Sequence, residues 1–219
     1  MTHYLRNCLI AGLLCSLGLP SLAESQITET EASILSITIR VYDYARVPAP
    51  IAKRAREETS RIFREAGITT EWASCRIPGQ SIPEHSECQV TPLATDIHLN
   101  ILPRNMARKM MNHYSEFGAA FPLPNSFGNR ASIFYHRVDE LAESQGASRA
   151  LLLGHFMAHE IGHLLLGVNS HSETGLMHVP WDQAQRDKAY LGSLLFTDKE
   201  AQRIRSQTAA RVQATQASR

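Results

Sequence analysis

The sequence has no charge imbalance, no long apolar run beyond its N-terminus and no internal repeat, and each absence narrows the possible functions. Its 219 residues contain 22 Lys and Arg against 21 Asp and Glu. A nearly neutral chain presents no strong field to nucleic acid or to an anionic membrane surface, so we expect neither as a partner. No later segment is apolar over the length of a membrane span. Length and composition are typical of one globular domain, and the oligomeric state is not indicated.

The N-terminus has the layout of a secretory signal peptide. Arg6 precedes a short apolar run, and small residues ending at Ala23 follow it. We expect cleavage after Ala23, with an uncleaved anchor as the alternative, and export to the periplasm or the medium. The chain then divides into a signal peptide at 1–23, a flexible polar segment at 24–33 and a single domain at 34–219.

Cysteine is scarce, and its placement suggests one disulfide. Of four cysteines, two lie in the expected signal peptide, which leaves Cys75 and Cys88 in an exported chain. The residues between them are rich in turn formers, so we expect a disulfide that contributes about 3 kcal/mol in the chain-entropy model. A zinc knot that uses His85 is the alternative, but no CxxC pair supports it.

Hydrophobic periodicity predicts an α+β fold, a small twisted sheet with helices packed on it. Strands are expected at 34–47, 68–75, 95–103 and 131–138. Helices are expected at 50–67, at 148–167 and from a capping box at Thr197 and Glu200 onward, with a possible short helix within 104–115. The stretches 116–130 and 168–182 are rich in turn formers and are expected to be loops.

Histidine is the one residue type in excess. Five of the ten histidines fall within 155–178, and the stretch "HEIGHLLLGVNSH" begins at His159. His159 and His163 are four residues apart, so on a helix their rings share one face and can reach one ion at the 2.0–2.1 Å of a Zn–N bond. Glu160 lies about 100° further round the helix, where it can exchange a proton with a metal-bound water. This is the chemistry of the H-E-x-x-H motif.

A catalytic zinc site needs a third protein ligand, and the chain offers one soon after the helix. Gly167 can adopt the left-handed conformation that ends a helix and reverses the chain. His171 follows four residues later and is the expected third ligand. His178, Glu173 and Glu200 are the alternatives.

Other candidate side chains carry weaker signals. His155 lies eight residues before His163, about 12 Å along a helix, so both cannot easily bind one ion, and His155 is expected in the core or behind the ligands. Tyr114 and Tyr190 could donate to an oxyanion, but neither is assigned this role. Trp181 is expected in a pocket wall or in the core.

The ordered set of residues resembles the metzincins, a clan of zinc-dependent endopeptidases with the pattern H-E-x-x-H-x-x-G-x-x-H and a Met-containing turn. "HEIGH", the glycine, the pair "HS" and "GLM" are most similar to matrix metalloproteinases and related secreted bacterial proteases. Gly167 follows His163 by four residues instead of three, and His171 follows it by eight instead of six. The resemblance implies one catalytic Zn²⁺ held by the three histidines, Glu160 as general base and Met177 in the Met-turn.

The resemblance also implies a zincin/metzincin-like fold with a long active-site helix and a C-terminal helical subdomain. Residues 178–181 would form a wall of the pocket for the substrate side chain after the scissile bond. The strand at 131–138 would be the sheet edge that pairs with an extended substrate. The function expected is an exported zinc-dependent endopeptidase that acts on protein or peptide. A non-catalytic zinc-binding module and a zinc hydrolase of a non-peptide amide are the alternatives.

Overall fold

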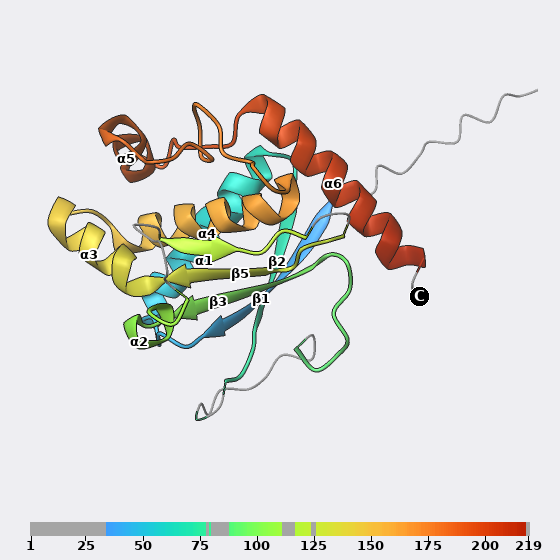
Figure 1. The fold of residues 1–219 in the computed structure, drawn as a ribbon, viewed down its shortest axis with the longest axis horizontal. Coiled ribbons are helices and arrows are strands. Elements are labelled where there is room, and N and C mark those ends of the chain that lie inside the picture. Colours follow the sequence, from blue (N-terminus) through green and yellow to red (C-terminus); the bar gives the residue numbers. More distant parts are fainter. Residues whose placement is uncertain (1–33, 78, 80–87, 111–116, 124–125, 218–219) are drawn as a thin grey trace, which may run out of the picture. The chain divides into compact units, whose positions relative to one another are not determined.

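The computed structural model describes residues 34–77, 79, 88–110, 117–123 and 126–217, which belong to one compact unit, Ser33–Arg219. The described residues form a mixed α/β structure with a mostly parallel five-stranded sheet and six helices (Figure 1). The expected signal peptide at 1–23 and flexible segment at 24–33 lie outside these residues. None of the described helices has both the length and the apolar character needed to cross a bilayer.

The sheet has the strand order β2-β1-β3-β5-β4, and only the β4–β5 pair is antiparallel. The strands are β1 (Ser36–Asp43), β2 (Thr69–Ser74), β3 (Asp96–Leu102), β4 (Gly118–Ala120) and β5 (Arg130–Phe134). The alternation in β1 buries Ile37, Ile39 and Val41 on one face, as the sequence predicts. Each fully buried aliphatic side chain of this kind stabilises the fold by about 1.5–3 kcal/mol.

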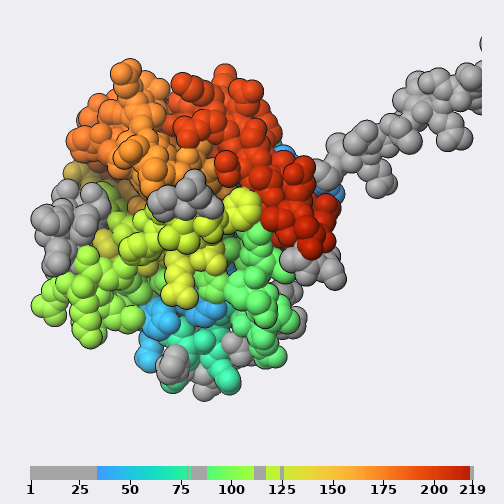
Figure 2. Space-filling view, turned by 45° about the vertical axis from the view of Figure 1, so that its right-hand side comes forward, coloured from blue at the N-terminus to red at the C-terminus, as the bar shows by residue number. Residues whose placement is uncertain are grey.

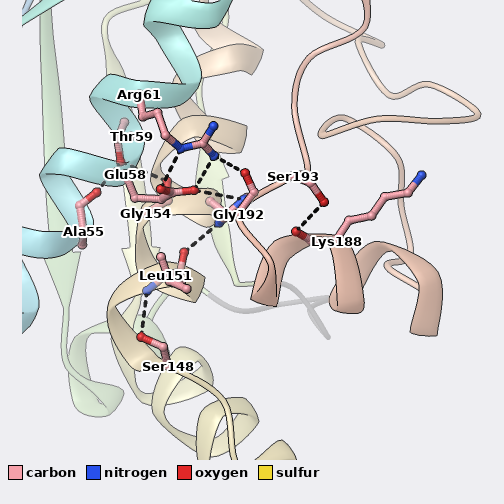
Figure 3. Close-up of polar contacts among 11 residues, drawn as sticks. Ala55, Glu58, Thr59, Arg61, Ser148, Leu151, Gly154, Lys188, Gly192 and Ser193 are labelled. Carbon is pink, nitrogen blue, oxygen red and sulfur yellow. Dashed lines mark hydrogen bonds and ion pairs between the residues drawn. The ribbon is translucent and has the colours of Figure 1, made fainter.

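Two long helices lie side by side along the sheet, α1 and α4 (Figure 1). The helices are α1 (Ala49–Glu65), α2 (Arg104–Ala107), α3 (Tyr135–Gln145), α4 (Arg149–Leu166), α5 (Gln183–Tyr190) and α6 (Asp198–Ala217). Gly154 lets α1 and α4 approach closely, because a Cβ there would lie 2.8 Å from the carbonyl oxygen of Ala55. The hydroxyl of Thr59 lies 2.9 Å from the carbonyl oxygens of both Ala55 and Gly154, across the contact (Figure 3).

The C-terminal helix α6 supports the end of α4. Its start has the predicted capping box, in which Thr197 N–H donates to Glu200 Oε2 at 2.7 Å and Glu200 N–H donates to Thr197 Oγ1 at 3.3 Å. Arg211, further along α6, is buried and donates to the carbonyl oxygens of Leu164 and Gly128. Burial lowers the pKa of Arg211 to about 10, a value that still leaves the guanidinium charged at neutral pH. A cation is favourable beside the last carbonyls of a helix, so Arg211 fixes the point where the chain leaves α4.

Cys75 and Cys88 form a disulfide with a Cα–Cα distance of 5.6 Å. This agrees with the pairing expected for an exported chain. His85, the residue of the alternative zinc knot, lies outside the described residues. The disulfide connects the end of β2 to the segment that leads into β3.

The prediction that the strand at 131–138 forms the sheet edge is wrong. The predicted strand at 131–138 is β5, but it lies between β3 and β4 and ends at Phe134. The sheet edge is β4, which consists of three residues in the stretch 116–130 that the sequence indicates as a loop. Such a short strand has no periodicity of its own, and only its pairing with β5 makes it a strand.

Two helices were also missed. In α3, the β-branched and aromatic residues that suggested a strand continue into a helix that buries Val138 and Ala142, four residues apart. This helix ends at Gly146, which has the left-handed φ of 61°. In α5, Asp182 is the N-cap and accepts a hydrogen bond from Gln185 N–H at 3.1 Å. Eight mostly polar residues gave α5 no hydrophobic periodicity to detect.

A candidate metal centre in an apolar cleft

Helix α4 places His159 and His163 on one face, as their spacing predicts. The helix starts at the N-cap Ser148, and Gly167, with φ +87°, follows its last residue. Both limits agree with the sequence prediction. The Nε2 atoms of His159 and His163 are 3.1 Å apart, close to the separation of two nitrogen ligands on one zinc ion.

The chain beyond Gly167 turns back and brings His171 to the same point. One ring nitrogen from each of His159, His163 and His171 lies within 4.8 Å of the other two. The ring centroids of His163 and His171 are 4.7 Å apart, and those of His159 and His171 are 5.7 Å apart. His159 is buried and His171 is exposed, so the cluster is open to solvent on one side.

Two hydrogen bonds orient the rings of the helical histidines. The carbonyl oxygen of Leu176 can only accept, so His159 Nδ1–H donates to it at 2.8 Å. His163 Nδ1 lies 2.7 Å from the hydroxyl oxygen of Ser170. In each ring Nδ1 is therefore engaged, and the two Nε2 atoms face each other. Metal-binding histidines are normally held in this way.

Burial also favours the form of the rings that binds a metal. Desolvation lowers the pKa of His159 to about 4 and the pKa of His163 to about 3. The hydrogen bond to Leu176 raises the pKa of His159, but by less than burial lowers it. Both rings are thus neutral at neutral pH, as metal ligands must be.

Glu160 lies next to the cluster, and its side chain occupies space that is free because residue 118 of the edge strand is a glycine. Its side chain is buried and lines the same cavity as the three histidines. A Cβ at Gly118 of β4 would lie 2.6 Å from Glu160 Cγ and 2.7 Å from its Cδ. Only glycine can therefore occupy position 118 without displacing this carboxylate.

Met177 lies behind the histidines and is fully buried. A Cβ at Gly162 would lie 2.8 Å from Met177 Sδ and 2.9 Å from Phe196 Cε1, so the thioether packs against the backbone of α4 between the two helical histidines. The sequence predicts a Met-turn at this place. The residue before the methionine, Leu176, supplies the carbonyl that holds His159.

The alternative ligands lie outside the cluster of three histidines. His178 Nδ1 lies 3.2 Å from the carbonyl oxygen of Ser172, and Glu200 caps α6. Glu173 is exposed. His155 is fully buried one turn earlier on α4, where its Nδ1–H donates to the Leu151 carbonyl oxygen at 2.8 Å, as expected of a core histidine.

The cluster opens into a cavity of about 760 Å³. Three stacked rings form one part of its wall, because Phe156 lies between Phe117 at 4.0 Å and Trp181 at 4.5 Å, centroid to centroid. Exposed apolar residues such as Phe121 and Val168 also line it. Figure 2 shows the two chain segments that supply most of the lining, the one that includes β4 in yellow-green and the one after α4 in orange, on the same face of the molecule.

Of the predicted wall 178–181, the last three residues line the cavity. Tyr190 does not line it, and Tyr114 lies outside the described residues. Sequence reasoning missed Ser170, Gly118 and Phe156. Ser170 belongs to the motif segment and could have been suspected as the partner of a ligand histidine, here His163. Gly118 and Phe156 lie near Glu160 and Trp181 only through the fold.

A hydrogen-bond network connects α1 to the segment after α5, the helix that carries the lining residue Arg186. Arg61 donates through Nε and Nη2 to the carboxylate of Glu58, at 3.0 and 2.7 Å, and through Nη2 to the carbonyl oxygen of Gly192 (Figure 3). Ser193 N–H donates to the Lys188 carbonyl oxygen at 2.8 Å at the end of α5. These bonds attach α5 to the core through α1.

Comparison with known proteins gives little further information. No family model matches the chain, and no curated protein matches it. Among solved structures, a structure of myroilysin matches with a TM-score of 0.32 and 14% identity, and the match covers 75% of this chain. The match spans 64% of the length of that structure. At this level the similarity assigns neither a fold family nor a function, so the functional argument depends on the site itself.

Proposed function

We propose that the chain is an exported zinc-dependent endopeptidase. The observation that carries the proposal is the convergence of three imidazoles beside a buried carboxylate in an open, apolar cleft. Three nitrogen ligands with one open position are typical of catalytic zinc, whereas structural zinc is normally closed by four protein ligands. The donor set, all imidazole, also suits zinc better than calcium or magnesium.

The residues at the site suit a zinc ion, and each has a separate role in metal binding or proton transfer. His159, His163 and His171 would hold it. A Zn²⁺ ion held there would act as a Lewis acid, which makes water a stronger acid and polarises a carbonyl. Glu160 accepts a proton from the attacking water and later returns it to the leaving amine. The side chain of Glu160 packs against Gly118, which restricts the positions that its carboxylate can take.

The edge strand β4 offers a way to hold the substrate. In the described strand order β4 pairs with β5 on one side and with no strand on the other, so one edge of β4 is open. An extended peptide can add to such an edge by main-chain hydrogen bonds while its side chains enter the adjoining cavity. Strand addition on β4 replaces the sequence-based hypothesis that placed the substrate on the strand at 131–138.

The proposal includes a relationship to the metzincins. It is supported by the order of the motif residues and by the buried position of Met177 under α4. The loop between Gly167 and His171 accommodates the longer spacing. The proposal also includes export by the signal peptide at 1–23, with which the disulfide is compatible.

The test measures metal content and proteolysis on the same preparations. Wild type should bind one zinc ion per chain and digest an unfolded protein. Glu160→Gln should keep the metal and lose at least about 100-fold in rate, as expected for loss of a general base. His171→Ala should lose metal, whereas His178→Ala, a histidine of the same loop outside the cluster, should retain it.

Each part of the proposal has an outcome that contradicts it. Digestion by Glu160→Gln at the wild-type rate would exclude the mechanism. Full zinc content in His171→Ala would exclude the third ligand. Wild type that binds zinc stoichiometrically but cleaves no member of a broad peptide library would instead be a non-catalytic zinc-binding module.

A further inference from the structure

The cavity beside the candidate metal centre contains one permanent cation. Arg186 lines it from α5, and the apolar side chains of Leu141, Phe156 and Trp181 line the same cavity. Among the lining residues that the structure describes, Glu160 is the only one with a carboxylate. Because Glu160 is needed for proton transfer in the proposed function, Arg186 requires a separate explanation.

Within the residues that the structure describes, the guanidinium of Arg186 binds two neutral acceptors and no carboxylate. Its Nη1 donates to the Trp181 carbonyl oxygen at 2.5 Å, and its Nη2 donates to Gln183 Oε1 at 3.0 Å. Its Nε is buried and makes no hydrogen bond within the described part of the chain. By contrast, Arg40 and Arg149 form ion pairs with carboxylates. A guanidinium has five N–H groups, so Arg186 retains unused donors at the cavity, and it forms no ion pair with a described carboxylate.

Both ends of α5, the helix that carries Arg186, are held by hydrogen bonds. Asp182 caps the start of the helix, and the end is attached to α1 by the hydrogen bond from Arg61 to Gly192 (Figure 3). The bond from Arg186 to the Trp181 carbonyl ties the cation to the aromatic wall. A specificity group on a rigid element can discriminate between ligands without the cost of being ordered on binding.

We propose that Arg186 determines specificity by selecting a substrate group with an apolar stem and a carboxylate at its tip. This inference rests on the proposed peptidase function. The stem would lie along the aromatic and aliphatic wall, and the carboxylate would accept from the unused N–H groups of Arg186. The group is either a glutamate side chain after the scissile bond or the C-terminal carboxylate of a short leaving fragment. A charge-assisted hydrogen bond of this kind should favour the acid over its amide by about 10- to 100-fold.

The experiment compares zinc-loaded variants on matched peptides. One series differs only in the residue after the cleaved bond, Glu, Gln or Leu. A second pair ends shortly after the cleaved bond as free acid or as amide. For wild type, kcat/KM should be at least tenfold higher for Glu than for Gln, or for the free acid than for the amide, and the pair that discriminates identifies the source of the carboxylate. Arg186→Gln should bring that ratio close to one, and Arg186→Lys should retain part of it. Lys188→Gln, an exposed cation on the same helix, should leave the ratio unchanged.

Failure of this inference is distinguishable from failure of the proposed function. If wild type cleaves all peptides but treats acid and amide alike, the inference is overturned and the peptidase function stands. If Arg186→Gln keeps the full ratio of acid to amide, the inference is again overturned. A loss of stability in Arg186→Lys would then mean that the role of Arg186 is structural. If no peptide is cleaved, the peptidase function fails. The dissociation constants of Glu-containing and Gln-containing peptides for the zinc-loaded Glu160→Gln variant then decide the question, since equal values contradict selection by Arg186.

Discussion

Single side chains outside the H-E-x-x-H motif decide how well the imidazoles of the candidate centre are held. Ser170 is the clearest case, since its hydroxyl is the partner of His163 Nδ1 at 2.7 Å. Ser170→Ala should leave the fold intact and lower zinc affinity by about 10- to 100-fold, the usual effect of losing a group that orients a metal ligand. Competition with a chromophoric chelator would measure this. Ser172→Ala, whose hydroxyl donates to the Thr174 carbonyl oxygen, is the matched control, and equal zinc affinity in both variants would refute the role of Ser170.

A substitution at Gly118 tests whether the position of the Glu160 carboxylate matters for activity without changing Glu160 itself. In Gly118→Ala the new Cβ would lie 2.6 Å from both Glu160 Cγ and the Ser132 carbonyl oxygen, so either the side chain or β4 must move. We expect peptidase activity to fall by about 100-fold, since displacements near 1 Å have effects of this size, while zinc content stays at one per chain. Activity and metal content of the purified variant check this. Wild-type activity in Gly118→Ala would show that Glu160 is not held by the edge strand.

At the scale of elements, a substitution at Gly162 of α4 would change the stability of the fold in two opposite ways. Replacing glycine by alanine inside a helix stabilises it by about 1 kcal/mol. The Cβ would, however, lie 2.8 Å from Met177 Sδ and 2.9 Å from Phe196, and overpacking of a core costs about 1–3 kcal/mol. Gly162→Ala should therefore be destabilising overall in denaturant unfolding. Combining it with Met177→Ala should cost less than the sum of the two single changes, because truncation of Met177 removes one of the two close contacts of the new Cβ. Additive costs, or a stabilised Gly162→Ala, would contradict this packing.

The elements also show what the sequence could and could not predict. The limits of α4 were predictable because Ser148 and Gly167 are local signals, and β1 and β3 were predictable from alternation. The edge strand β4 was not, because three residues become a strand only by pairing with β5. The same division holds for the site. The spacing of the histidines indicated the cluster, whereas Gly118 and Arg186 reach the cavity only through tertiary packing, which leaves no pattern in the sequence.

At the scale of the whole molecule, buried neutral histidines couple folding to pH. Burial lowers the pKa of His155, which lies between α1 and α4 with its Nε2 3.5 Å from Glu58 Oε1. Glu58 raises that pKa and Arg61 lowers it, but both effects are smaller than that of burial. In the metal-free protein His159 and His163 have lowered pKa values for the same reason.

The sign of the pH dependence follows from these shifts. A histidine with its folded pKa below the unfolded value of about 6.5 binds its proton more readily in the unfolded state, so its contribution to stability is present above that value and is lost as pH falls below it. For His159, with a folded pKa of about 4, the loss should extend down to about pH 4. We expect the free energy of unfolding of the chelator-treated protein to fall steeply between pH 6.5 and 4, where carboxylates also contribute. His155→Gln removes one of the titrating rings, so the difference in stability between wild type and this variant should shrink or change sign as the pH falls. Denaturant unfolding of both proteins at several pH values would measure it, and a difference independent of pH would mean that His155 is not held neutral by the fold.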